Sequence, residues 1–416
     1  MSNVIEFLRN RKLIEQMTHL ELSQAADTPL AFYYGIDPTA DSLHIGNLVG
    51  LVMAMHFARF GHTPVVLLGG ATGLIGDPSG KDKERPLLTK EQVAVNVKSL
   101  QKLIRKFLPE AIFVNNGDWY EQMNVIEFLR DVGKQFRVGS MMGKESVRTR
   151  LASDAGMSYT EFSYQLLQGY DFVHLLDQHG VVLQIGGSDQ YGNITAGTEL
   201  VRRVKGQSVF GLTYPLLTRS DGKKFGKSEN GAIWIDEDHL SPYEFYQYLF
   251  RTPDADVIRF MRALTLLETS EIEEIEIRMK ASDYEVHSAQ KKFAEAVTLL
   301  VHGEDGLKKA LKTTEIATPG KLFFDEESLS EVAKNMPNKE LSRDEVIHRS
   351  FIEVSVSSGL LASKGEARRL IQNGGAYVNG NKLEDLDFVF QESHFLKKEY
   401  LVLSAGKKKS LLIKLV

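Results

Sequence analysis

Residues 31–47 read AFYYGIDPTADSLHIGN, and this stretch joins an apolar strand to the start of a helix through a polar turn. Its first half is apolar and aromatic, as is typical of a buried strand. Residues 44–60 carry a broad apolar face and stop at Gly61, which predicts a helix. We expect Asp41 or Ser42 to cap its first turn. A buried strand followed at once by a helix is the unit of parallel α/β sheets.

Three further short runs repeat the strand pattern. Each is apolar, rich in β-branched residues, and ends in Gly or Asn: TPVVLLGG (63–70), AIFVNN (111–116) and GVVLQIGG (180–187). Helical patterns separate the runs, so we predict a Rossmann-like, doubly wound parallel sheet. Ligands of such sheets bind beyond the carboxyl ends of the strands. The polar tails GIDPT, GGATGLIGD and GGSDQ are therefore expected to face one crevice.

The composition is that of an ordinary globular protein. The 416 residues are 43% hydrophobic and 25% charged, with a net charge of −5, so the whole chain is not an electrostatic nucleic-acid binder. The chain has no Cys, which excludes disulfides, thiolate zinc sites and a Cys nucleophile, and fits a reducing cytosol. The first 20 residues predict an amphipathic helix, and no 18-residue apolar run occurs. We therefore expect a cytoplasmic protein with no membrane segment.

The chain is expected to contain several domains. Helical, charged sequence without strand patterns follows the sheet, and a short segment rich in Pro, Gly and acidic residues follows that. Residues 350–416 hold ten Lys or Arg and seven Asp or Glu, a net charge of +3, against −8 for the rest. We predict an α/β domain at 1–220, an α-helical domain with the lysine-rich loop at 221–320, a linker at 321–345 and a small α+β domain at 346–416.

When each is taken alone, two loops and one histidine can be explained without a catalytic or binding role. The glycine-rich 69–81, GGATGLIGDPSGK, lacks the spacing of a phosphate-binding loop, and a tight turn accounts for it equally well. In 220–231, SDGKKFGKSENG, two lysines lie among Gly and Ser. They suit a solvated surface loop, or a flexible loop that closes over a polyphosphate. A lone His44 at a turn is by itself more often structural than catalytic.

Taken together, the motifs resemble a known family. HIGN opening the first long helix (44–47) and KFGKS after the last strand (224–228) are similar to the two signatures of class I aminoacyl-tRNA synthetases. YYGIDPTADSLHIGN, GGATGLIGDPSG, SYQLLQGYDF, QIGGSDQYGNITAG and KFGKS resemble the bacterial tyrosyl-tRNA synthetases, in the same order. The tail resembles their S4-like RNA-binding domain.

The resemblance implies an activity and its partners. Such enzymes form tyrosyl-adenylate from tyrosine and ATP, release pyrophosphate, and pass tyrosine to the 3′ end of tRNA(Tyr). Mg²⁺ is expected to arrive with ATP as substrate, without a protein-bound metal or prosthetic group. A homodimer is expected, through the region 115–150.

The implied reaction needs no nucleophile from the protein. The attacking carboxylate of the substrate is already ionised at pH 7, so the site has only to position it and to stabilise charge on the phosphates. Matching the motifs residue by residue assigns catalytic roles to Thr39, His44, Lys81, Arg85, Gln190, Lys224 and Lys227. The same match assigns ATP binding to Gly35, Gly46, Asn47, Gly187, Asp189, Lys227 and Ser228.

The amino-acid pocket is expected in YQLLQGYD. Tyr164, Gln168 and Asp171 are spaced to share one helical face. By resemblance, Tyr164 and Gln168 hold the substrate ammonium with Asp77, and Asp171 with Tyr33 binds the phenolic hydroxyl. The full expected tyrosine set is Tyr33, Asp37, Asp77, Tyr164, Gln168, Asp171 and Gln184. In the tail, Lys364, Arg368 and Arg369 are the expected RNA-binding residues.

Two departures from the family pattern and two rival functions complete the prediction. The fourth residue of the first signature is Asn47 instead of His, and Gly50 replaces a Thr found in some relatives. One rival is a synthetase-derived RNA-binding or splicing protein that needs no catalysis. The other is a tryptophanyl-type ligase, although Tyr33 with Asp171 suits a phenol better than an indole.

Overall fold

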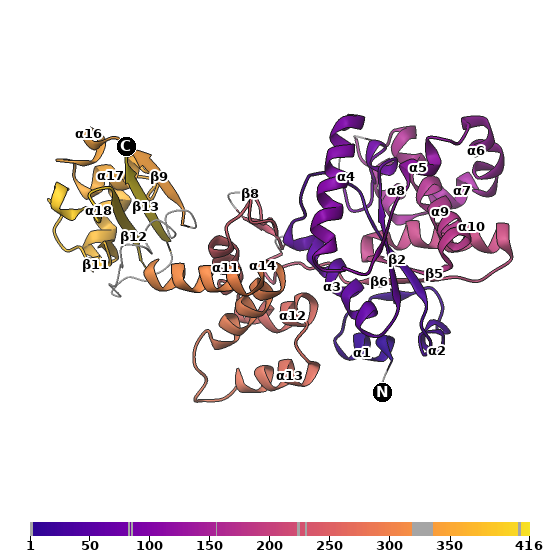
Figure 1. Cartoon of the computed structure of the whole chain (residues 1–416), viewed down its shortest axis with the longest axis horizontal. Coiled ribbons are helices and arrows are strands. Elements are labelled where there is room, and N and C mark those ends of the chain that lie inside the picture. Colours follow the sequence, from indigo (N-terminus) through magenta and orange to yellow (C-terminus); the bar gives the residue numbers. More distant parts are fainter. Residues whose placement is uncertain are drawn as a thin grey trace. The chain divides into compact units, whose positions relative to one another are not determined.

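The chain divides into two compact units in a computed structural model (Figure 1). The model describes residues 3–81, 84, 86–154, 156–222, 225–228, 231–317, 336–406 and 409–416. The first unit comprises Met1–Asp236 and Asp254–Tyr284, and the second comprises Glu237–Pro253 and Glu285–Val416.

A six-stranded sheet forms the centre of the first unit, in the order β1-β6-β5-β2-β3-β4. Its strands are β1 Gln16–Met17, β2 Ala31–Ile36, β3 Thr63–Leu68, β4 Ile112–Asn115, β5 Val181–Gly187 and β6 Phe210–Tyr214. All neighbours pair in parallel except β1, which runs antiparallel to β6. The predicted Rossmann-like fold class is confirmed. The strand order reverses between β2 and β5, and a crevice at their carboxyl ends is the usual ligand site of this architecture.

In the described residues, the helices of the first unit are α1 Val4–Asn10, α2 Leu22–Ala25, α3 Ile45–Arg59, α4 Lys90–Arg105, α5 Gly117–Tyr120, α6 Val125–Asp131, α7 Val138–Met142, α8 Glu145–Leu151, α9 Tyr159–His179, α10 Tyr191–Lys205, α12 Asp254–Leu264 and α13 Thr269–Arg278. Figure 1 shows α4 on one side of the sheet, and α9 and α10 on the other. The short hairpin β7 Lys227–Ser228 and β8 Gly231–Ala232 completes the unit. The amphipathic pattern of the first 20 residues forms α1 and then β1, not one long helix.

The long helix α9 is fixed at both ends. The Oγ of Ser158 accepts a hydrogen bond from the N–H of Glu161 (3.2 Å), and Gly180 ends the helix in the left-handed conformation (φ 62°). Near its start, Glu161 forms a bidentate ion pair with Arg150 of α8, with N–O distances of 2.9 and 2.7 Å. Both side chains are almost fully buried. This pair ties the segment before α9 to the helix.

Replacing Arg150 by alanine should strongly destabilise the first unit. The change leaves the carboxylate of Glu161 buried without its partner, which typically costs about 3–5 kcal/mol. Chemical denaturation of the variant measures the loss. Arg130→Ala is the control, because its pair with Asp131 is exposed at the surface and should contribute less than about 1 kcal/mol. Equal effects of the two changes would contradict the expectation.

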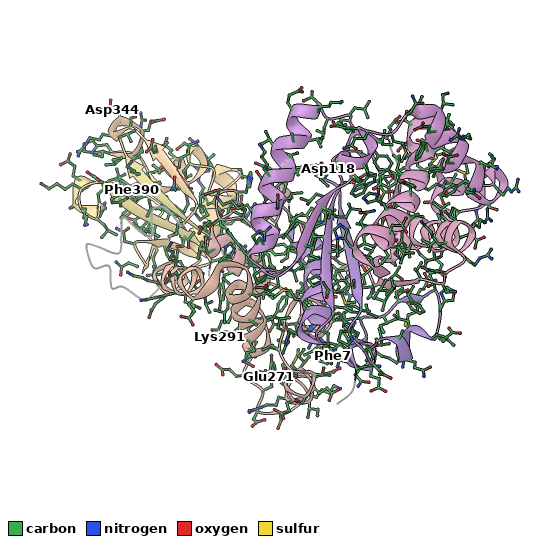
Figure 2. The ribbon with its side chains drawn as sticks, turned by 45° about the vertical axis from the view of Figure 1, so that its right-hand side comes forward. Phe7, Asp118, Glu271, Lys291, Asp344 and Phe390 are labelled. Carbon is green, nitrogen blue, oxygen red and sulfur yellow. The ribbon has the colours of Figure 1, made fainter. Side chains whose placement is uncertain are left out.

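The described part of the second unit contains one long helix, several short helices and a five-stranded sheet. Its helices are α11 Pro242–Phe250, α14 Ser288–Ala317, α16 Arg343–Val346, α17 Phe351–Ser357 and α18 Lys364–Gln372. The sheet order is β11-β10-β12-β13-β9, with β9 Asn338–Leu341, β10 Ala376–Val378, β11 Asn381–Lys382, β12 Tyr400–Ala405 and β13 Lys409–Leu415. Phe390, labelled in Figure 2, is fully buried in the core of this α+β part. Because β9 pairs with β13, residues 338–341 belong to the sheet, although a linker was expected there.

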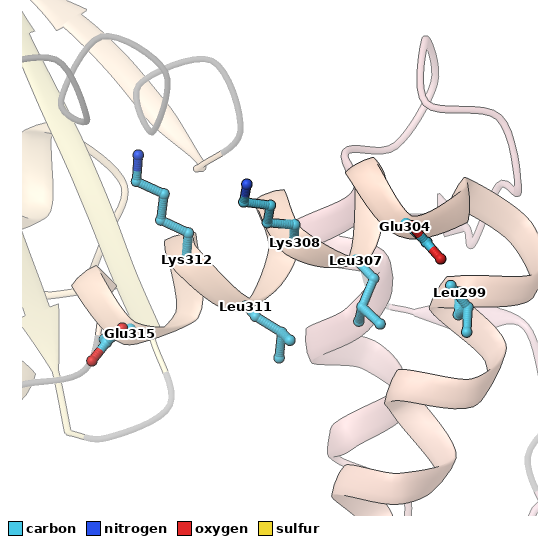
Figure 3. A pocket seen from close by; sticks show the side chains of 7 residues that line it. All are labelled: Leu299, Glu304, Leu307, Lys308, Leu311, Lys312 and Glu315. Atoms are coloured by element: carbon cyan, nitrogen blue, oxygen red, sulfur yellow. The ribbon is translucent and has the colours of Figure 1, made fainter.

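Helix α14 is broken at Gly303, which has a φ of 69°. A hollow of about 600 Å³ lies along the helix, lined by Leu299, Glu304, Leu307, Lys308, Leu311, Lys312 and Glu315. Figure 3 shows Leu307 and Leu311 pointing to one side, and Lys308 and Lys312 to the other. None of the expected site residues lines this hollow. In the described part of the chain, no helix is long and apolar enough to cross a membrane.

Candidate active site

The first signature forms the start of α3. His44 is the N-cap: its Nδ1 accepts a hydrogen bond from the N–H of Gly46 (3.0 Å), and its own N–H donates to Oδ1 of Asn47 (3.2 Å). The expectation that Asp41 or Ser42 caps this helix is therefore wrong. Because Nδ1 accepts a hydrogen bond, the proton of the neutral ring lies on Nε2. His44 is exposed, so this N–H can donate to a ligand beside the helix N-terminus.

Backbone pairing explains why the helix starts so late. The N–H of Ile45 donates to the carbonyl of Ile233 (2.8 Å), and the N–H of Ile235 donates to the carbonyl of Leu43 (2.9 Å). These bonds flank His44, which is extended (φ −92°, ψ 163°), so the segment that follows the second signature keeps the chain out of the helix up to this residue. The two signatures lie side by side even though nearly the whole sheet separates them in sequence.

Glycine at position 226 makes this close approach work. Gly226 has a φ of 91°, and a Cβ there would lie 3.0 Å from Cγ2 of Ile45 and 3.3 Å from the backbone nitrogen of Gly46. Any other side chain would both strain the backbone and push the two segments apart. Lys227 and Ser228 form β7, and their side chains lie outside the described part of the structure, as does all of Lys224.

Buried polar side chains on β2, β5 and α9 form a cluster, which we call the polar pocket. Tyr33 and Gln184 are register partners on these strands, and Gln168 and Asp171 reach the pocket from α9. In the part of the chain that the structure describes, Oη of Tyr33, Oε1 of Gln168 and Oε1 of Gln184 are buried without a hydrogen-bond partner. Buried polar atoms without partners are rare and costly, so three in one pocket indicate a polar ligand.

Asp171 of α9 belongs to this cluster and is almost fully buried. Its carboxylate accepts hydrogen bonds from Nδ2 of Asn116 and Nε1 of Trp119, both at 3.2 Å. Burial raises the pKa of Asp171 to about 7, against the lowering effect of these donors. Neither Asn116 nor Trp119 was predicted as a site residue. Asn116 is the last residue of a predicted strand (111–116), so the rule that ligands bind at the carboxyl ends of strands also applies to it.

The charge on Asp171 should make the ligand-free protein lose stability as the pH rises. A carboxyl with a raised pKa binds its proton more tightly in the folded state, so the free energy of unfolding should fall between about pH 4 and pH 7. The full shift corresponds to about 4 kcal/mol at most. Denaturant unfolding of wild type and Asp171→Asn at pH 5 and pH 8 isolates this group. The same pH dependence in both proteins would contradict the expectation.

Two carboxylates, those of Asp37 and Asp77, lie close to Tyr164 of α9. Asp37 accepts hydrogen bonds from Oη of Tyr164 (2.9 Å) and Oγ1 of Thr72 (2.7 Å). Asp77 accepts one from Nε2 of Gln190 (2.7 Å). Burial raises the pKa of Tyr164 well above its ordinary value, and the charges of Asp37 and Asp77 raise it further. Two carboxylates that converge on one buried hydroxyl form an environment that favours a cation.

The glycine-rich loop after β3 shapes the same region. A Cβ at Gly69 would lie 2.1 Å from Oδ1 of Asp37, so only glycine lets this carboxylate and Thr72 meet there. Gln190 also accepts a hydrogen bond from Nε2 of Gln168 (3.3 Å), which joins Asp77 to the α9 side of the pocket. The glycine-rich loop therefore helps to position the carboxylates of Asp37 and Asp77, in addition to any role of Lys81.

The remaining expected ATP residues lie at the ends of β2 and β5. A Cβ at Gly187 would lie 2.7 Å from Oδ1 of Asp189, and one at Gly80 would lie 3.1 Å from its Oδ2, so Asp189 lies between the two loops. Gly35, Thr39 and Lys81 are exposed on this side. Arg85 lies outside the described residues. The space at Gly50 is taken by the hydroxyls of Tyr34 and Tyr214, at 2.4 and 2.5 Å from a built Cβ, which excludes a threonine there.

The expected RNA-binding residues lie in the second unit, on α18. Lys364, Arg368 and Arg369 are all exposed, and Lys364 lies 3.7 Å from a carboxylate oxygen of Glu353.

Comparison with known proteins agrees with this geometry. Residues 25–317 match a family described as tRNA synthetases class I (W and Y), and residues 328–413 match the tyrosine–tRNA ligase SYY-like C-terminal domain. The chain is 49% identical to the tyrosine–tRNA ligase of Protochlamydia amoebophila, covering 100% of both chains. It is 45% identical to that of Streptococcus pneumoniae, covering 98% of both.

Solved structures show the same fold. A C-terminally truncated mitochondrial tyrosyl-tRNA synthetase from Aspergillus nidulans is 30% identical with a TM-score of 0.66, covering 74% of this chain and 92% of that one. The tryptophanyl-tRNA synthetase of Plasmodium falciparum shares the fold at 14% identity and a TM-score of 0.55, covering 78% of this chain and 87% of that one. The relatives from Protochlamydia amoebophila and Streptococcus pneumoniae match over the full length, and the chain therefore belongs to the tyrosine–tRNA ligases of the class I tRNA synthetase family.

Proposed function

We propose that the crevice of the first unit activates tyrosine by in-line phosphoryl chemistry. A carboxylate oxygen of tyrosine attacks the α-phosphorus of ATP, a new O–P bond forms, and the bond to the β-phosphate breaks to release pyrophosphate. No proton has to be removed, because the carboxylate is ionised at neutral pH. The site's contribution is to hold the two substrates in line and to stabilise charge on the phosphates.

The partnerless polar atoms of the buried pocket carry this proposal. A tyrosine phenol placed between Asp171 and Tyr33 gives Oη of Tyr33 the hydrogen-bond partner that it lacks, and its O–H is a further donor to the carboxylate of Asp171. Gln184 lies beside Tyr33 across the β2–β5 pair and can take part in the same contacts. The substrate ammonium then meets Asp77, Tyr164 and Gln168, close to Asp37.

The phosphates are proposed to lie at the N-terminus of α3. The helix dipole and the Nε2–H of His44 both favour negative charge there. Gly46 and Asn47 let the nucleotide approach the first turn, and Asp189 is proposed to bind the ribose. Thr39, Gln190 and the cations of the two loops complete the set. Lys81, Arg85, Lys224 and Lys227 are assigned to the phosphates by resemblance alone.

The second half-reaction uses tRNA. A ribose hydroxyl of its terminal adenosine attacks the carbonyl of tyrosyl-adenylate, an ester bond forms, and AMP leaves. We propose that Lys364, Arg368 and Arg369 bind the tRNA backbone. Mg²⁺ is proposed to enter with the phosphates of ATP, which are its preferred ligands. A cytoplasmic location is proposed, and the absence of cysteine fits a reducing compartment.

Amino-acid-dependent exchange of pyrophosphate into ATP, with all twenty amino acids, tests the assignment of the pocket. We expect exchange with tyrosine alone. Exchange that depends on tryptophan would favour the tryptophanyl-type reading of the pocket, and no exchange would favour an RNA-binding role without catalysis.

We also propose that two copies of the chain pair through the segment around α6 and α7. Val125 and Ile126 are each 66% exposed, and Val138 is 61% exposed. Leu129 and Met142 lie exposed on the same helices. Apolar side chains gathered on neighbouring short helices are typical of a protein–protein interface. The family's dimeric architecture makes a second copy the occupant.

Replacing Ile126 by aspartate should therefore convert the dimer to a monomer. A charge buried at the centre of an apolar interface has no partner, and its burial costs several kcal/mol. Sedimentation equilibrium measures the association. Val286→Asp is the matched control, because Val286 is also strongly exposed but lies far along the chain, after α13. A dimer that survives Ile126→Asp would place the interface elsewhere.

A further inference from the structure

Asp256, near the start of α12, is buried and yet accepts hydrogen bonds from the chain that leads to the second signature. Its Oδ1 and Oδ2 lie 3.1 and 3.0 Å from the backbone nitrogen of Ser220, and Oδ2 lies 3.0 Å from Oγ of the same residue. Nη2 of Arg259, one turn along the helix, donates to Oδ1 (2.8 Å). The carboxylate is 1% exposed.

These contacts hold residues 218–220, which we call the stem of the lysine-rich loop, at several points. Arg259 also donates a hydrogen bond to the carbonyl of Thr218, so α12 binds the backbone at both 218 and 220. Beyond the stem, the ring of Phe225 packs on Phe260, with their centroids 4.3 Å apart. The same helix thus contacts the chain both before the second signature and within it.

Helix α12 is itself held firmly at its other end. Arg11, which is fully buried, donates to the carbonyls of Arg262 (3.0 Å), Thr265 (2.8 Å) and Met261 (3.3 Å). Such carbonyls have no partner within the helix, and an arginine is a suitable group to satisfy them. A loop stem attached to the first turn of α12 is therefore attached to a fixed support.

The charge on Asp256 is retained in the folded protein. Burial acts to raise its pKa, but the hydrogen bonds from Ser220 and Arg259 outweigh it and hold the pKa below its ordinary value. An ionised carboxylate that accepts two or more N–H and O–H bonds is a strong and directional anchor. The hydrogen bonds that Asp256 accepts from Ser220 join α12 to the stem of the loop.

We propose that Asp256 is a positioning residue for tyrosine activation, which sets the place of the KFGKS loop by holding the backbone of Ser220. The proposal rests on the assigned role of Lys224 and Lys227 at the phosphates. Asp256 is not assigned to either substrate; it acts through the backbone at residues 218–220, which precede KFGKS in the sequence.

Asp256→Asn tests the proposal, because asparagine keeps the size but can accept on one oxygen only and has lost the charge. The single-turnover rate of tyrosyl-adenylate formation should fall on the order of 10- to 100-fold, as expected when a reacting group is misplaced by about 1 Å. Tyrosine affinity, measured by equilibrium dialysis without ATP, should change less than about twofold. Ser220→Ala, which removes only the hydroxyl, should give a smaller loss of the same kind.

Controls separate positioning from general damage. Glu276→Gln removes a carboxylate that pairs with Arg262 at the far end of α12 (2.7 Å), and it should leave the rate unchanged. If Asp256→Asn weakens tyrosine binding as much as it slows the reaction, the residue is merely structural. If Asp256→Asn is fully active while Lys227→Ala is slow, this proposal fails alone. If both are fully active, the assigned role of the loop fails with it.

Discussion

Replacing Asp171 by asparagine is expected to weaken tyrosine binding by about 10- to 100-fold, the loss of one hydrogen bond to a charged group. Phenylalanine has no hydroxyl to place there, so its binding should change little. The preference for tyrosine over phenylalanine should fall by the same factor. A site made to hydrogen-bond a hydroxyl rejects a ligand without one because its buried polar groups then stay unpaired, and tyrosyl-tRNA synthetases are themselves the standard example of this effect.

The structure makes this substitution more disruptive than its size suggests. The carboxylate accepts from Asn116 on one oxygen and from Trp119 on the other. Asparagine has a single acceptor oxygen, so one of these two donors loses its partner as well. Part of the loss in affinity should therefore come from reorganisation of the pocket wall, and Asn116→Ala should reproduce part of it.

Equilibrium dialysis with tyrosine, and pyrophosphate exchange with both amino acids, measure the effect. Asp177→Asn is the matched control: it is the same change on the same helix, but Asp177 is partly exposed and pairs with Lys205 (2.6 Å) away from the pocket. ATP affinity should be unchanged in both variants. Normal tyrosine affinity in a folded Asp171→Asn protein would show that another group reads the hydroxyl.

Ending the chain after Ala317 is expected to separate the two half-reactions. Every residue assigned to tyrosine and ATP lies before position 229, so tyrosine-dependent pyrophosphate exchange should stay close to that of the full chain. Charging of tRNA at subsaturating concentration should fall at least about 100-fold, because the cations that neutralise phosphates are lost. The cut lies before β9, since residues 338–341 pair in the C-terminal sheet.

Salt dependence distinguishes lost phosphate contacts from other damage. The double variant Arg368→Ala, Arg369→Ala in the full chain should weaken tRNA binding. The slope of log affinity against log salt concentration should become shallower by about two, about one for each lost phosphate contact. Lys414→Ala is the control, because this exposed lysine of β13 is paired with Glu340 (2.9 Å). A truncated enzyme that charges tRNA at full rate would show that the tail does not bind it.

The central part of the fold was predictable because its signals are local. Four apolar runs that end in Gly, Asp or Asn became β2, β3, β4 and β5, each within a residue or two of the predicted bounds. Helix α3 also ends as predicted, with Gly61 at a φ of 87°. Buried parallel strands and long amphipathic helices are specified by their own composition, whatever the rest of the chain does.

The parts that sequence reasoning missed depend on distant contacts. Strand β1 has two residues, and it exists only because β6 pairs with it almost 200 residues later. Asp41 and Ser42 have the better intrinsic preference for a cap, but pairing of residues 43–45 with 233–235 moves the start of α3 to His44. No local pattern encodes such pairings.

The same limit applies to the site. Family resemblance named Tyr33, Asp171 and Gln184, and the structure brings them into one pocket, yet their roles remain predictions until they are tested. Asn116, Trp119 and Asp256 were missed because each acts on a residue that is remote in sequence. The donor and acceptor relations that single them out exist only in three dimensions.

The pairing of residues 43–45 with 233–235 also bears on how the protein is made. Closing a loop of this length has an entropic cost that only the finished contacts repay, so this part of the molecule should form late in folding. A chain emerging from a ribosome can shape most of its sheet early, since domains begin to fold during synthesis. The first turn of α3 cannot be fixed in this way until residues 233–235 have left the exit tunnel. A nascent chain should therefore hold no working nucleotide site until more than half of it has been translated.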